Sequence, residues 1–202
     1  MTNENYKNEI CEIQPFEMKN IPLILDVVLP MWSPPAEDMT FRRFYVENIV
    51  RNNCFENDLK FQLVNPDFCS MAFFARKTDN CKVEDWYKKE AKKFPEKLLC
   101  SSELGKSYIE LMDQKTRSFM KDDDIQLTLY GSRKKGCGSK LLDALCEKLR
   151  EQGFKNLYLW TDCECNWQWY TKHGYELVST DVYKPFSSDN EDYLTYIFRK
   201  EL

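Results

Sequence analysis

The stretch SRKKGCGS, residues 132–139, decides the fold because it joins a strand pattern to a helix pattern through two glycines. Before it, IQLTLY at 125–130 alternates apolar and polar residues as a half-buried strand does. After it, leucines recur at helical spacing in KLLDALCEKLREQG. The first N–H groups of a helix have no intrahelical partner and carry partial positive charge. The junction therefore predicts a site for a phosphate group.

We call this expected anion site the cradle. It comprises three cations, a loop and the first helical turn: Arg133, Lys134, Lys135, Gly136, Cys137, Gly138, Ser139 and Lys140. Gly136 and Gly138 lack a Cβ, so a ligand is expected to approach the backbone closely there.

Three alternatives compete with any specific reading of the cradle. A dinucleotide fingerprint needs a small third residue, but Leu141 stands there. A P-loop needs Lys and Ser or Thr where Cys137 and Gly138 stand. A glycine-rich turn into an ordinary helix also fits six residues taken alone, because short motifs carry a false-positive risk.

Residues 133–138, RKKGCG, fit [RQ]-x-x-G-x-[GA] and resemble the pyrophosphate loop of the GNAT superfamily of N-acetyltransferases. A second stretch, CECNWQWYTKHGYELVS at 163–179, resembles the C-terminal signature of that family. There a short helix ends in the pair Trp169–Tyr170, and Gly174 fits a left-handed helix cap. Asn166 is expected as the N-cap of this helix. The resemblance covers the last third of the chain.

The resemblance implies direct transfer of an acetyl group from acetyl-CoA to a primary amine of an unknown acceptor. It implies that Tyr170 protonates the leaving thiolate as general acid, although Tyr170 also fits a plain core aromatic. Backbone N–H groups of Leu129, Tyr130 and Gly131 are expected to bind the thioester and the pantetheine arm. Asn166 is either a ligand of that arm or only a helix cap.

The general base has no clear candidate. His173 is expected to interact with the C-terminus of its own helix, and Asp162 and Glu164 are acidic but unspecific. A covalent role for Cys137 is not expected, because transfer in the family is direct. The chain also lacks the Pro-containing pair that most family members place before the loop, so Gly131 is expected to supply the bend.

For the fold, the resemblance implies one domain over 1–202 of the mixed α/β (α+β) class. A central, mostly antiparallel sheet is flanked by helices, with a helical insertion at 76–121 between the third and fourth strands. That insertion is either a solvated decoration or a wall over the acceptor pocket. The patterns predict helices at 19–29, 38–50, 85–94 and 104–120. They predict strands at 9–16, 59–64, 68–75, 125–130, 154–162 and 193–199, with another after Gly174.

Composition narrows the function classes. The net charge of −4 over 202 residues gives no general case for nucleic-acid or membrane binding. Nine scattered cysteines without C-x-x-C and one histidine predict free thiols and no metal site. A polar N-terminus without a secretory signal predicts a cytoplasmic protein. The expected partner is a small-molecule or peptide amine, and a homodimer stays open. The alternative functions are a non-catalytic acyl-CoA-binding regulatory module and a nucleotide-binding protein.

Overall fold

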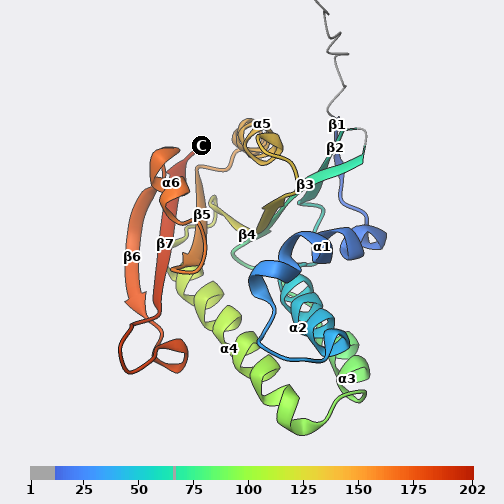
Figure 1. Cartoon of the computed structure of the whole chain (residues 1–202). Coiled ribbons are helices and arrows are strands. Elements are labelled where there is room, and N and C mark those ends of the chain that lie inside the picture. Colours follow the sequence, from blue (N-terminus) through green and yellow to red (C-terminus); the bar gives the residue numbers. More distant parts are fainter. Residues whose placement is uncertain (1–11, 66) are drawn as a thin grey trace, which may run out of the picture.

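The sheet is the centre of the molecule. The computed structural model describes residues 12–65 and 67–202, and its seven strands lie in the order β1-β2-β3-β4-β5-β7-β6 (Figure 1). Among the described strands, only β4 and β5 pair in parallel. This confirms the predicted mixed, mostly antiparallel sheet. The strands are β1 Glu12–Pro15, β2 Lys60–Asn65, β3 Asp67–Arg76, β4 Ile125–Ser132, β5 Asn156–Asp162, β6 Glu176–Val182 and β7 Leu194–Glu201.

Helices cover both faces of this sheet. They are α1 Ile21–Trp32, α2 Met39–Asn52, α3 Glu84–Ala91, α4 Glu96–Phe119, α5 Cys137–Glu151 and α6 Gln168–Lys172, with short 3-10 turns η1 Met18–Asn20 and η2 Lys184–Phe186. Strand β3 is buried on both sides, and its side chains alternate between them. Phe74 packs in the cluster that contains the leucines of α5, whereas Phe73 packs with residues of α1 and α2. The result is a three-layer arrangement.

The segment between β3 and β4 is helical, as predicted. It forms α3 and the 24-residue helix α4, which starts at Glu96, earlier than its apolar pattern indicates. On α4, Tyr108 and Met112 pack with Tyr158 and Ile197 of β5 and β7. Helix α4 is therefore part of the packed structure and not a solvated decoration (Figure 1).

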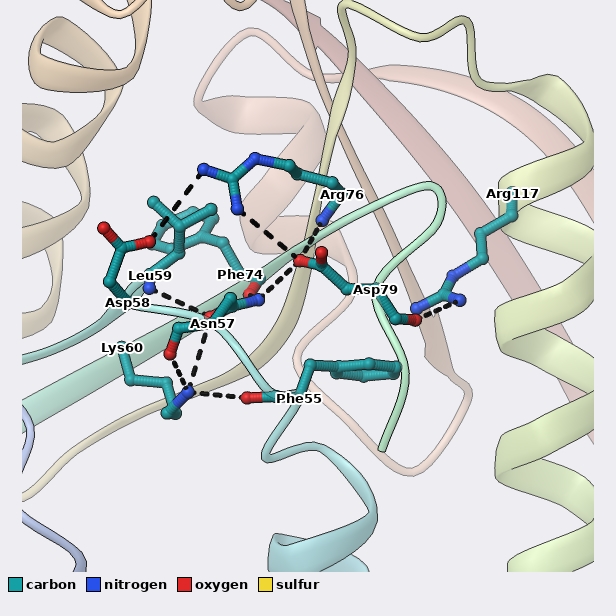
Figure 2. A network of polar contacts seen from close by, with 9 residues as sticks. All are labelled: Phe55, Asn57, Asp58, Leu59, Lys60, Phe74, Arg76, Asp79 and Arg117. Atoms are coloured by element: carbon teal, nitrogen blue, oxygen red, sulfur yellow. Dashed lines mark hydrogen bonds and ion pairs between the residues drawn. The ribbon is translucent and has the colours of Figure 1, made fainter. Parts of the chain in front are cut away.

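A polar network fixes the C-terminal end of α4 to the end of β3 (Figure 2). The Asp79 carboxylate accepts hydrogen bonds from the Arg76 backbone N–H (2.9 Å) and from the Asn57 amide (2.6 Å). The Asn57 amide also donates to the Phe74 carbonyl at 2.9 Å. From α4, Arg117 donates to the Asp79 carbonyl at 3.0 Å. These bonds tie three segments that are distant in sequence.

Several element boundaries differ from the predictions. Helix α1 continues through Pro30 to Trp32, and β4 continues to Ser132. The expected hairpin is present, because Asn65 pairs with Asp67, although residue 66 lies outside the described residues. The same holds for residues 9–11 of the first predicted strand. The cysteines in the described part are all free, and none of its helices is long and apolar enough to cross a bilayer.

Candidate active site

The two parallel strands at the centre of the sheet separate. β4 and β5 pair at Ile125–Leu157 and Gln126–Tyr158 and no further along the described strands. Next to this point, a bulge shifts the β3–β4 register, so Thr128 is the extra residue between Leu127 and Leu129. The Thr128 hydroxyl donates to the Asn53 carbonyl at 3.0 Å. The sequence carries no signal for this bulge.

An open cavity of about 890 Å³ lies at the separation. Its walls include Leu129 and Tyr130 of β4, Trp160 of β5, and Tyr108 of α4. Helix α4 thus forms a wall of the cavity. The other lining residues are Met31, Trp32, Ser33, Pro34, Pro35, Tyr45, Ile49, Asn53, Gly105, Ile109, Leu127, Thr128, Leu159, Thr161, Asp162, Glu164, Cys165, Asn166, Trp169, Tyr170, Phe186 and Tyr193.

Tyr170 lies on α6 with its side chain at the cavity. Its ring packs edge-on against that of Tyr175, with centroids 5.3 Å apart, and at a tilt of 32° against that of Phe198, with centroids 5.6 Å apart. Burial raises the pKa of the Tyr170 phenol, and the nearby Tyr130 and Cys165 add to the increase. The phenol therefore carries its proton at neutral pH, as a proton donor must.

The C-terminal end of α6 agrees with the prediction, whereas its N-terminal end does not. Gly174 has φ +81°, the left-handed conformation predicted for a helix cap. The prediction for Asn166 as side-chain N-cap is wrong, because the N-cap position is Trp167 and no side chain caps it. The backbone carbonyl of Asn166 accepts a hydrogen bond from the Trp169 N–H at 3.1 Å. Asn166 also lines the cavity.

The cradle forms the entry to α5. Gly136 has φ +82°, and a Cβ built there would meet nothing within 4 Å, so its backbone faces open space. Within the described residues, the N–H groups of Gly136, Gly138 and Ser139 make no hydrogen bond. The Arg133 N–H donates to the Cys69 carbonyl at 2.7 Å, which fixes the loop against β3.

The side chains of the cradle divide into two groups. Arg133, Lys134, Lys135 and Lys140 are exposed, and the Lys134 ammonium donates to the Asn65 carbonyl at 2.7 Å. Cys137, by contrast, is buried at the start of α5 and does not line the cavity. The open face of the cradle therefore consists of backbone amides with cations around them.

Two glycines have other roles than the sequence suggests. A Cβ on Gly138 would lie 2.5 Å from the Tyr130 hydroxyl, so its missing side chain makes room for protein and not for a ligand. Gly131 is paired with Met71 inside β4 and has no positive φ, so the bend predicted there is absent. Gly131 also does not line the cavity, unlike Leu129 and Tyr130.

The packing at Gly138 leads to a stability prediction. We expect Gly138→Ala to cost about 1–3 kcal/mol of unfolding free energy, because the new methyl must displace the Tyr130 phenol. In a Tyr130→Ala background the same change should cost much less, measured by urea unfolding. Gly136→Ala is the matched control, since its cost of about 1–2 kcal/mol comes from φ and should persist in both backgrounds. Equal Gly138 costs in both backgrounds would contradict the contact.

The cavity contains two carboxylates and no basic side chain among its lining residues. Asp162 ends β5 and accepts a hydrogen bond from the Glu164 N–H at 3.1 Å. Burial and the charge of Asp162 raise the pKa of Glu164. Burial raises the pKa values of Tyr45 and Tyr193, which line the same cavity; the charge of Glu164 adds to both increases, and that of Asp162 adds to the increase at Tyr193.

His173 is not part of this group. Its ring stacks on Trp169, with centroids 3.8 Å apart, and its Nδ1 lies 2.7 Å from the Trp169 carbonyl. The contact is at the C-terminus of α6, where the sequence predicts it. His173 is exposed and lies outside the cavity lining.

Comparisons with known proteins agree with the fold. Residues 130–175 match the family model described as the acetyltransferase (GNAT) family. The ribosomal-protein-S18-alanine N-acetyltransferase of Escherichia coli superposes with a TM-score of 0.56 at 14% identity, covering 95% of this chain and 94% of that one. No match is found among curated proteins.

Two further solved structures are similar in fold. One is the Drosophila melanogaster polyamine N-acetyltransferase, with a TM-score of 0.54, 13% identity, and coverage of 96% of this chain and 100% of that one. The other is a mosquito arylalkylamine N-acetyltransferase-like protein, with a TM-score of 0.52, 12% identity and the same coverage. At these identities the likeness concerns the fold.

Proposed function

We propose that this chain, in which residues 130–175 match the GNAT acetyltransferase family model, transfers an acetyl group from acetyl-CoA to the primary amine of a small molecule, with Tyr170 as general acid. The observation that carries the proposal is the divergence of β4 and β5. It creates one cavity that borders both Tyr130, next to the cradle, and Tyr170. We also take 1–202 as one domain, with α3 and α4 as an insertion that walls the acceptor site.

The cradle is suited to the diphosphate of the coenzyme. The unpartnered N–H groups of Gly136, Gly138 and Ser139 lie at the positive end of the α5 dipole. The exposed Arg133 and Lys135 add charge beside them. From there the pantetheine arm would run along β4, where Leu129 and Tyr130 line the cavity. Asn166 would contact the arm from the opposite wall.

The chemistry needs two proton transfers. The amine nitrogen forms a bond to the acetyl carbon, the carbon–sulfur bond breaks, and the coenzyme leaves as a thiolate. Tyr170 gives its proton to this thiolate. The proton of the amine goes towards Asp162 and Glu164, of which Glu164 is the better acceptor because its pKa is raised.

The cavity argues for a small acceptor over a folded protein. At about 890 Å³ it is of the size of small-molecule sites, and α4 closes one side of it. Proteins of similar fold include a polyamine N-acetyltransferase and an arylalkylamine N-acetyltransferase-like protein. The alternative, a non-catalytic acyl-CoA-binding module, predicts the same coenzyme affinity without turnover.

A thermal-shift titration followed by a rate assay tests the proposal. We expect acetyl-CoA to raise the melting temperature of the whole chain and ATP at equal concentration not to do so. A panel of primary amines should then release coenzyme thiol in an amine-dependent reaction. Stabilisation by ATP alone would favour a nucleotide-binding protein. Stabilisation by acetyl-CoA without thiol release for any amine would favour the binding module.

A further inference from the structure

The cavity has an aromatic end that the proposed chemistry does not use. Four of its lining rings cluster there, and Tyr108 of α4 lies at the centre of them. Its ring centroid is 5.3 Å from that of Trp160, 5.1 Å from that of Phe186 and 6.0 Å from that of Tyr193. These rings come from α4, β5, η2 and the residue just before β7. We call the four rings the aromatic end.

One of these rings is held rigidly from behind. The Trp160 indole N–H donates to the Asp113 carboxylate at 2.8 Å, and the Gln126 amide donates to the same oxygen at 2.6 Å. Asp113 and Gln126 are buried. The only polar atom of the Trp160 side chain is occupied by this bond, so the ring is fixed in orientation. Because the ring is already ordered, a ligand that packs on it costs little side-chain entropy.

Charge in the cavity is confined to one place. Asp162 and Glu164 are two residues apart at the end of β5, and the other lining residues are neutral. Asp162 borders the aromatic end, because it lines the same cavity and lies two residues after Trp160 on β5, on the same side of the strand. A polyamine needs carboxylates at intervals along its length. A ligand with one ammonium group and an apolar body matches this distribution better.

We infer that the acceptor is an arylalkylamine, whose ring packs within the aromatic end and whose nitrogen lies at Asp162 and Glu164 near Tyr170. This inference rests on the proposed function and specifies its substrate class. The ring adds apolar area that is buried on binding, and stacked or edge-on contacts with four rings add to it. A short alkylamine lacks the ring and its contacts. The contribution of the ring should therefore appear as a higher kcat/KM for the arylalkylamine than for the short alkylamine.

The experiment compares 2-phenylethylamine, ethylamine and spermidine as acceptors, with thiol release as the readout. We expect kcat/KM for 2-phenylethylamine to exceed that for ethylamine by about 10- to 100-fold and to exceed that for spermidine. Phe186→Ala should reduce the ratio of the two monoamines to a few-fold. Tyr183→Leu is the control, because Tyr183 packs on Tyr108 and Phe186 but does not line the cavity, and it should keep the ratio.

The outcomes distinguish a failure of the arylalkylamine inference from a failure of the acetyltransferase function. Preference for spermidine, or equal values for both monoamines, overturns the arylalkylamine and leaves the acetyltransferase standing. Coenzyme stabilisation without turnover of any amine overturns the proposed function and the inference with it. If Phe186→Ala does not fold, Phe186→Leu removes the ring while keeping an apolar side chain. The wild-type ratio is decisive in either case.

Discussion

Replacing Tyr170 by Phe should lower kcat by about 100- to 1000-fold while the dissociation constant of acetyl-CoA stays within about twofold. The change removes one hydroxyl and keeps the ring contacts with Tyr175 and Phe198. Without the phenol proton, the thiolate must leave unprotonated or take its proton from water. Thiol release at saturating amine measures kcat, and calorimetric titration measures coenzyme affinity.

Tyr175→Phe is the matched control for this substitution. Tyr175 is a neighbouring tyrosine, but its hydroxyl is buried away from the cavity and makes no hydrogen bond within the described residues. Its removal should leave kcat nearly unchanged. Equal losses in both variants would assign the effect to packing. An unchanged kcat in Tyr170→Phe would remove Tyr170 from the mechanism, and a second proton donor would then be needed.

Replacing Asp113 by Ala should cost about 2–4 kcal/mol of unfolding free energy, whereas Asp113→Asn should cost little or nothing at neutral pH. In the alanine variant, the buried N–H groups of Trp160 and Gln126 lose their shared acceptor, and each unsatisfied group costs about 1–3 kcal/mol. Asparagine keeps an oxygen for both donors and removes a buried charge. Urea unfolding of the three proteins measures the difference.

The pH dependence gives this prediction a second readout. Burial raises the pKa of Asp113 in the folded protein, against the opposing effect of its two hydrogen bonds and of Arg117. A carboxyl with a raised pKa stabilises the fold fully below its unfolded pKa of about 3.9 and loses this contribution as the pH rises through its folded pKa. The stability of Asp113→Asn relative to wild type should therefore increase from acidic to neutral pH. A constant or decreasing difference would contradict the raised pKa.

Much of the fold could be predicted because its signals are local. The leucine spacing of α5 and the alternation of β4 are properties of adjacent residues, and both elements are present. The left-handed Gly136 and Gly174 stand where a helix starts or ends, and only glycine adopts that conformation at low cost. Segments such as the start of α4 were less predictable. Its first turns are polar, and packing on the helix as a whole stabilises them.

The candidate site was only partly predictable for the same reason. Tyr170 and Leu129 were found through motifs and lie at one cavity. Gly131 and Gly138 have other roles than the sequence predicts, because side chains distant in sequence occupy the space around them. Asn166 is not the N-cap, because its helix starts one residue later. Trp160 and Tyr108 carry no motif. They become a binding surface because α4 packs across β5.

The sequence by itself determined most of the elements, the glycine loop that begins α5 and the turn that ends α6, since each depends on the conformational preferences of a few consecutive residues. Only the tertiary structure decided where β4 leaves β5, which residue bulges and which rings meet across the opening. Those features depend on contacts between residues such as Tyr108 and Trp160, which are far apart in the chain. Such contacts form only when the layers pack together, so no local pattern can encode them.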